Sequence, residues 1–207
     1  MAYDPDVCVV DDDHAVRESL QILLETMGYA IRAYGSGLAF LEEYSALEPG
    51  CVLLDVRMPK MSGLDVQKRL QAERPDLPVV IVTGHGDVKM AVQAMKAGAI
   101  DFIEKPFQED ALLASVRNAL SLAEQAQRRD EAIAAIHRNL GRLTPRERDV
   151  FDQLIIGHAN KVIARALDCS PRTIEIHRAR VMEKMEAASV AHLVRMALAV
   201  DIEILED

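Results

Sequence analysis

Short apolar runs alternate with amphipathic segments over the first 124 residues of the chain. Three apolar runs, at residues 7–10, 51–54 and 79–82, have the length and the β-branched content of buried strands. Weaker strands are predicted at residues 30–34 and 101–104. Strands that are apolar throughout and separated by helices are typical of a parallel sheet covered on both faces. We therefore expect an α/β domain with a five-stranded, doubly wound parallel sheet.

The pattern changes after this region. Residues 108–139 contain few helix breakers, which predicts a helix that closes the first domain and continues as a linker. Thr144 and Glu147 then have the spacing of a capping box. Helical periodicity continues from there, and a tight turn joins the segments at 160–167 and 171–185. The expected divisions are a first domain at residues 1–122, a helical linker at 123–139 and an all-α, four-helix domain at 140–207.

The composition is that of a globular protein, because 50% of the 207 residues are hydrophobic and 28% are charged. No apolar run approaches the roughly 18 residues that a membrane helix needs, and no basic-then-apolar leader opens the chain. The three cysteines form no CxxC pair, which argues against a disulfide framework. We therefore expect a cytoplasmic protein without a membrane partner.

The net charge of −9 is unevenly distributed. Residues 1–124 carry 20 acidic and 11 basic side chains, whereas residues 138–200 carry 7 acidic and 11 basic ones. The excess acidity therefore belongs to the first part of the chain, and the segment at residues 138–200 is mildly basic, a charge that suits a nucleic-acid partner. With 4% aromatic residues and no Trp, the chain lacks a stacking platform for single strands or RNA. Duplex DNA is the favoured partner.

Polar side chains follow four of the predicted strands. They are Asp11, Asp12, Asp13, Asp55, Thr83 and Lys105. Parallel strands end at one edge of a sheet, and carboxylates gathered there repel unless a cation intervenes. An oxygen-only ligand set favours Mg²⁺. Asp55 then becomes a candidate nucleophile for a phosphoryl group, with Lys105 neutralising charge. Any one of these residues could be an ordinary cap or turn residue, as we interpret Asp13, but their coincidence favours a site.

The sequences Val9-Val10-Asp11-Asp12-Asp13, Leu54-Asp55-Val56-Arg57-Met58-Pro59 with Gly63, Thr83-Gly84 and Lys105-Pro106-Phe107 resemble the receiver domain of two-component response regulators. The resemblance covers residues 6–122 and implies a flavodoxin-like fold. It also implies that Asp55 is the phospho-acceptor and that Mg²⁺ is bound by Asp11, Asp12, Asp55 and the backbone carbonyl of Arg57.

By the same resemblance, Thr83 and Lys105 bind the phosphoryl group, and Phe102 occupies the aromatic switch position. The family also implies a cis peptide bond before Pro106.

The two helices around the turn at residues 168–170 are a candidate helix-turn-helix. Ile174, Val181 and Met185 are expected to face the core. The candidate DNA contacts are Lys161, Arg165, Arg172, Thr173, Glu175, Ile176, Arg178 and Arg180. A helical bundle with a solvated charged face would show the same pattern, so these residues alone leave both interpretations open.

The sequences Leu-Thr-Pro-Arg-Glu-Arg at 143–148 and Ser-Pro-Arg-Thr-Ile-Glu-Ile-His-Arg at 170–178 resemble the LuxR-type DNA-binding domain. The resemblance covers about residues 140–200. Together with Gly-His-Gly-Asp at 84–87, it points to the FixJ branch of response regulators. Relatives outside that branch often have a DNA-contacting Lys where Glu175 stands. A Glu there touches a base only by accepting from a cytosine amino group.

These resemblances imply a transcriptional regulator that is not an enzyme in the ordinary sense, although it takes part in its own phosphoryl transfer and dephosphorylation. A histidine kinase would phosphorylate Asp55 and thereby control homodimerisation and sequence-specific binding to duplex DNA, with RNA polymerase as a further partner. One alternative is a Mg²⁺-dependent aspartyl-phosphate phosphatase, although such enzymes usually need an Asp where Arg57 stands. The other alternative is a phosphorelay or adaptor protein that does not bind DNA.

Overall fold

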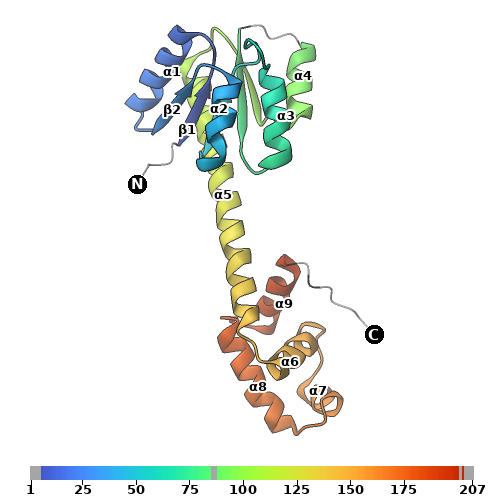
Figure 1. The fold of residues 1–207 in the computed structure, drawn as a ribbon. Coiled ribbons are helices and arrows are strands. Elements are labelled where there is room, and N and C mark those ends of the chain that lie inside the picture. Colours follow the sequence, from blue (N-terminus) through green and yellow to red (C-terminus); the bar gives the residue numbers. More distant parts are fainter. Residues whose placement is uncertain (1–5, 85–87, 201, 203–207) are drawn as a thin grey trace. The chain divides into compact units, whose positions relative to one another are not determined.

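The computed structural model describes residues 6–84, 88–200 and 202 (Figure 1). Residues 85–87 of the Gly-His-Gly-Asp segment therefore lie outside the described residues. The chain forms two compact units, Met1–Gln127 and Arg128–Asp207. Among the described residues, no helix is long and apolar enough to cross a bilayer.

The first unit contains a five-stranded parallel sheet in the order β2-β1-β3-β4-β5. The strands are β1 (Val7–Val10), β2 (Ile31–Tyr34), β3 (Cys51–Leu54), β4 (Val79–Thr83) and β5 (Asp101–Glu104). This topology confirms the predicted doubly wound sheet. Strand β4 runs one residue further than predicted because Thr83 pairs with Glu104 of β5. Strand β2 begins one residue later, since the backbone N–H of Ala30 donates to the carboxylate of Asp6.

Helices cover both faces of this sheet (Figure 1). They are α1 (His14–Thr26), α2 (Gly37–Glu43), α3 (Gly63–Glu73), α4 (Val88–Lys96) and α5 (Glu109–Gly141), with a 3-10 turn η1 (Tyr44–Ala46) after α2. Alternate residues of each strand point to opposite faces. Cys8 and Val10 of β1 thus pack in the layer of α2, α3 and α4, whereas Val7 and Val9 pack with α1 and the start of α5. Both faces of the central strands are buried, which explains why β1 and β3 are apolar throughout, whereas the edge strands β2 and β5 include exposed residues.

The second unit consists of the end of α5 and four further helices. These are α6 (Pro145–Ile155), α7 (Asn160–Ala166), α8 (Pro171–Lys184) and α9 (Val190–Ala199). Ile174 and Val181 of α8 and Met185 directly after it are fully buried, which confirms the predicted inward face of that helix. Ile136 of α5 packs into the same core.

The capping box predicted at the start of α6 is present and is joined to α8 by an ion pair. The Thr144 N–H donates to Glu147 Oε2 at 2.9 Å, and the Glu147 N–H donates to Thr144 Oγ1 at 3.3 Å. Lys184 Nζ lies 2.5 Å from Glu147 Oε2 and also donates to the Arg142 carbonyl at 3.0 Å. Glu147 is therefore buried but fully partnered, and it connects the first helix of the unit to the last turn of α8.

This pairing predicts a specific acid sensitivity of the second unit. The hydrogen bond from Lys184, followed by that from the Thr144 backbone, lowers the pKa of Glu147 to about 2. A depressed folded pKa stabilises the fold above the ordinary carboxyl pKa, and this contribution is lost as the pH falls from about 4.5 toward 2. We expect the wild type to lose stability over this range more steeply than Glu147→Gln, as measured by urea unfolding at each pH. Identical pH slopes for the two proteins would contradict the role assigned to the ion pair.

Candidate functional site

Three carboxylates meet at the carboxyl edge of the sheet. One oxygen from each of Asp11, Asp12 and Asp55 lies within 4.8 Å of the other two. Asp11 and Asp55 are buried at the ends of β1 and β3, whereas Asp12 is exposed. The structure thus brings together the predicted carboxylate ligands, and their oxygen-only chemistry fits a hard cation such as Mg²⁺. Arg57 has an exposed side chain, and coordination through its backbone carbonyl stays a prediction.

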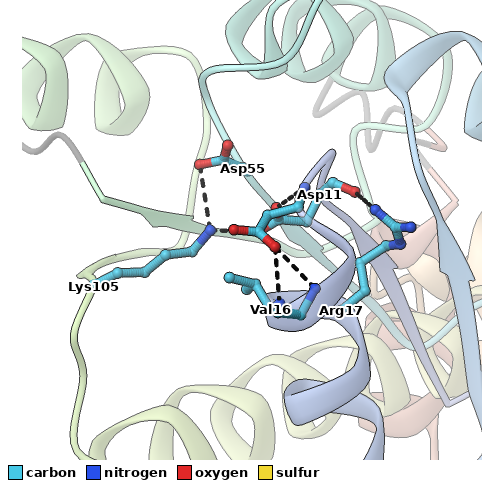
Figure 2. Close-up of polar contacts among 7 residues, drawn as sticks. Asp11, Val16, Arg17, Asp55 and Lys105 are labelled. Carbon is cyan, nitrogen blue, oxygen red and sulfur yellow. Dashed lines mark hydrogen bonds and ion pairs between the residues drawn. The ribbon is translucent and has the colours of Figure 1, made fainter.

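Lys105, directly after β5, places its ammonium group between two of these carboxylates (Figure 2). Its Nζ lies 2.5 Å from Asp11 Oδ2 and 3.8 Å from Asp55 Oδ1. The Lys105 N–H also donates to the Thr83 carbonyl at 2.9 Å, which fixes the end of β5 to the end of β4. The peptide bond to Pro106 is cis, as the receiver resemblance implies. The Lys105 ammonium therefore lies where it could neutralise negative charge on a phosphoryl group bound at Asp55.

Two buried oxygens at this edge lack hydrogen-bond partners among the described residues: Asp55 Oδ1 and Thr83 Oγ1. Burial raises the pKa of Asp55 above its ordinary value, and the Lys105 ammonium opposes this shift. Unpartnered buried polar atoms are costly in a protein interior. A metal ion and a phosphoryl group are the kinds of ligand that would satisfy both oxygens, so the donor set fits the group that the sequence predicts.

Arg17, which was not predicted from the sequence, fixes the backbone at Asp11. Arg17 of α1 donates from Nη1 to the Asp11 carbonyl at 2.7 Å, and the Asp13 N–H donates to Asp11 Oδ1 at 2.9 Å (Figure 2). Asp13 itself caps α1 by accepting from the Ala15 N–H at 2.8 Å, which confirms its interpretation as an N-cap. The sequence pattern that could have identified Arg17 is its position one helical turn after the N-cap Asp13, which itself follows the acidic end of β1.

The aromatic side chain at Phe102 lies on β5, paired with Ile81 of β4. It is half-buried and packs against the apolar layer formed with α2, α3 and α4. Thr83, two residues further along β4, is fully buried at the carboxylate edge. The two predicted switch residues therefore sit on neighbouring strands, one at the site and one on the helix-covered face beside it.

Gly63, the first residue of α3, is required by the close approach of that helix to the backbone of Asp55. A Cβ atom there would lie 2.0 Å from the Asp55 carbonyl oxygen and 3.0 Å from Val56 Cα. Backbone atoms cannot yield as a flexible side chain can, so we expect Gly63→Ala to destabilise the first unit by about 2 kcal/mol. Thermal unfolding measures this effect, with Gly141→Ala as the control because its Cβ would meet nothing within 4 Å. Equal melting temperatures for the two variants would contradict the expected clash.

In the second unit, α7 and α8 carry the predicted DNA-binding residues. The exposed ones are Lys161, Arg165, Arg172, Glu175, Ile176 and Arg180. Thr173 and Arg178 differ, since both are half-buried and bonded within the protein. The Thr173 hydroxyl lies 2.8 Å from Ser170 Oγ, which also caps α8. Thr173 is therefore bonded at the start of its own helix, whereas Arg178 is bonded to the neighbouring helix α7.

Two apolar side chains on the same helices are exposed, and one of them, Val162, is not among the residues predicted from the sequence. Ile176 of α8 is 49% exposed and Val162 of α7 is 47% exposed. Apolar side chains on the surface of a helix-turn-helix can contact thymine methyl groups in the major groove. Val162 becomes a candidate because Ile163 next to it is buried, so the two neighbours point in different directions.

Comparison with known proteins identifies a family for each of the two units. The response regulator receiver domain matches residues 7–117, and the luxR family of bacterial regulatory proteins matches residues 141–197. The transcriptional regulatory protein FixJ of Azorhizobium caulinodans is 49% identical over 192 residues, which are 93% of this chain and 91% of that protein. FixJ of Bradyrhizobium diazoefficiens is 46% identical, over 93% of this chain and 94% of that protein.

Solved structures show the same relationship. The response regulator StyR is 38% identical and superposes with a TM-score of 0.81, over 95% of this chain and 99% of that chain. Full-length FixJ from B. japonicum is 45% identical with a TM-score of 0.58, over 95% of this chain and 97% of that chain. The chain therefore belongs to the FixJ-type response regulators, the transcriptional regulators that combine a receiver domain with a LuxR-type DNA-binding domain.

Proposed function

We propose that Asp55 accepts a phosphoryl group from a cognate histidine kinase and that this modification controls DNA binding. The observation that carries the proposal is the meeting of three carboxylates within 4.8 Å with the Lys105 ammonium, which lies 3.8 Å from the buried Oδ1 of Asp55. Asp11, Asp12 and Asp55 would hold Mg²⁺, together with the backbone carbonyl of Arg57. When bound, the ion supplies positive charge that offsets the carboxylates and the phosphoryl oxygens.

The protein's own groups account for the transfer. A carboxylate oxygen of Asp55 forms a bond to phosphorus as the bond between phosphorus and the kinase's histidine nitrogen breaks, and that nitrogen leaves with the electron pair. Lys105, 3.8 Å from Asp55 Oδ1, neutralises the charge that develops on the phosphoryl oxygens. The buried Thr83 hydroxyl lies beside Asp55 and can donate to the new phosphoryl group.

The expected output is a change in assembly and in DNA affinity. In this proposal the receiver spans residues 1–122, the linker 123–139 and the DNA-binding domain 140–207. Phosphorylation, relayed through Thr83 and Phe102, promotes a homodimer that brings two helix-turn-helix units onto paired half-sites. The regulator acts in the cytoplasm and influences RNA polymerase at the sites that it binds.

The test uses the full chain with Mg²⁺ and beryllium fluoride, which mimics a phosphoryl group on Asp. We expect the mass measured by sedimentation to double and the affinity for duplex DNA to rise, with a steep dependence on salt. If neither the mass nor the DNA affinity changes, the proposal that phosphorylation acts as a switch is wrong. If duplex binding with salt dependence is absent in both states, the phosphorelay or adaptor alternative replaces the DNA-binding proposal. Catalytic turnover of small phosphoesters would favour the phosphatase alternative.

A further inference from the structure

Arg178 differs from the other predicted DNA-binding arginines of α8. Arg172 and Arg180 are exposed, whereas Arg178 is half-buried. Its Nη1 donates to Oδ1 of Asn160, the first residue of α7, at 3.2 Å. Asn160 is half-buried as well. The guanidinium of Arg178 is thus directed at the neighbouring helix of the pair.

The start of α7 lacks the side-chain N-cap that α6, α8 and α9 have. The helices α6, α8 and α9 are preceded by the N-cap residues Thr144, Ser170 and Ser189, and each of these side chains accepts a hydrogen bond from its own helix. The residue at the same position before α7 is Ala159, whose side chain cannot accept one. With only seven residues, α7 also has little stability of its own. The bond from Arg178 to Asn160 therefore gives this first turn a polar contact with α8, beside the apolar packing of Ile163.

We propose that Arg178 is a positioning residue for DNA recognition, and that its partner in this role is Asn160. The bond fixes the first turn of α7 against the middle of α8. It thereby presents the exposed cations of the two helices, Lys161 and Arg165 on one and Arg172 and Arg180 on the other, to the same duplex. Arg178 itself makes no phosphate contact in this account. The inference rests on the proposed DNA binding, and it revises the direct contact that the sequence alone predicts for Arg178.

Salt dependence distinguishes positioning from contact. Each phosphate that a protein cation neutralises releases condensed counterions and adds about 0.9 to the slope of log affinity against log salt. Removing a contacting cation such as Arg172 therefore lowers that slope by about 0.9. Removing a positioning residue weakens binding at every salt concentration and leaves the slope nearly unchanged.

The substitution Arg178→Lys distinguishes the effect of the positive charge from the effect of the hydrogen bond to Asn160. Arg178→Lys keeps the positive charge, but its side chain is one bond shorter and ends in an ammonium group, so it does not place a donor where Nη1 of Arg178 meets Asn160 Oδ1. A phosphate contact would survive Arg178→Lys to a large extent. A bond to the Asn160 amide that depends on guanidinium geometry would not.

The experiment measures binding of the full chain, with Mg²⁺ and beryllium fluoride, to a duplex that the wild type selects from a randomised pool. Fluorescence anisotropy is recorded over a range of salt for Arg178→Gln, Arg178→Lys, Asn160→Ala and the double variant Asn160→Ala with Arg178→Gln. Arg172→Gln and Arg180→Gln are the matched controls on the same helix. Hydrogen exchange of the α7 amides is measured on the same variants without DNA, and thermal unfolding verifies that each remains folded.

We expect Arg178→Gln, Arg178→Lys and Asn160→Ala each to weaken binding on the order of 10-fold with an unchanged slope, and the double variant to be no weaker than the worse single one. The α7 amides should exchange faster in these variants and not in the controls. A slope that falls by about 0.9 in Arg178→Gln, or full binding by Arg178→Lys, would overturn the inference and leave DNA binding intact. Unchanged exchange in α7 would overturn it even if the wild type bound no duplex, a result that would contradict the proposed function separately.

Discussion

Asp55→Asn should abolish the gain in DNA affinity that phosphorylation produces. Asn keeps the size of the side chain but offers no carboxylate oxygen that can form a bond to phosphorus. It also removes one of the three carboxylates that lie within 4.8 Å of one another, and with it part of the magnesium site. In the wild type we expect phosphorylation to raise duplex affinity on the order of 10-fold, and in Asp55→Asn we expect no change. Anisotropy titrations with and without acetyl phosphate and Mg²⁺ measure both values.

The matched control is Asp65→Asn, which removes an exposed carboxylate from α3 of the same unit. This variant should respond to acetyl phosphate as the wild type does. A response that persists in Asp55→Asn would show that another residue carries the switch.

Lys105→Met should slow phosphorylation about 100-fold, because it removes a positive charge fixed beside the phosphoryl site. The ammonium group lies 2.5 Å from Asp11 Oδ2 and 3.8 Å from Asp55 Oδ1, so its loss also leaves two buried carboxylates facing each other without a cation. The metal-free variant should therefore unfold at a lower temperature than the wild type. Mg²⁺ should raise its melting temperature by more than it raises that of the wild type. Intact-mass kinetics and thermal scans measure the two effects.

Lys96→Met provides the comparison for this variant, since Lys96 is exposed at the end of α4. Its phosphorylation rate and its response to Mg²⁺ should match the wild type. If Lys105→Met were phosphorylated as fast as Lys96→Met, the ammonium would have no part in the transfer.

The sheet and its acidic edge could be predicted because they follow from local patterns. The runs at Val7–Val10 and Cys51–Leu54 are apolar throughout, and burial on both faces is the physical reason for that pattern. Asp11 and Asp55 follow these two strands directly, so parallel pairing brings them to one edge. The inward face of α8 was predictable in the same way, from residues at helical spacing.

Contacts between polar side chains of different helices could not be predicted. Arg178 and Asn160 are separated by 18 positions, and Lys184 and Glu147 by 37. Hydrophobic periodicity indicates which side of a helix is buried, but it carries no information on which polar group of another helix a cation meets. For this reason the sequence predicts that Arg178 contacts DNA, whereas the structure shows its guanidinium donating to Asn160 of the neighbouring helix.

The central claim is that Asp55 is the residue that receives the phosphoryl group. The direct measurement is chemical: the full chain is phosphorylated with acetyl phosphate and Mg²⁺, the acyl phosphate is reduced with borohydride, and the modified residue is located by peptide mass spectrometry. The account predicts a single reduced site at position 55, present only when Mg²⁺ is added. A modification at Asp11, Asp12 or any other residue, or none at all under these conditions, would contradict it.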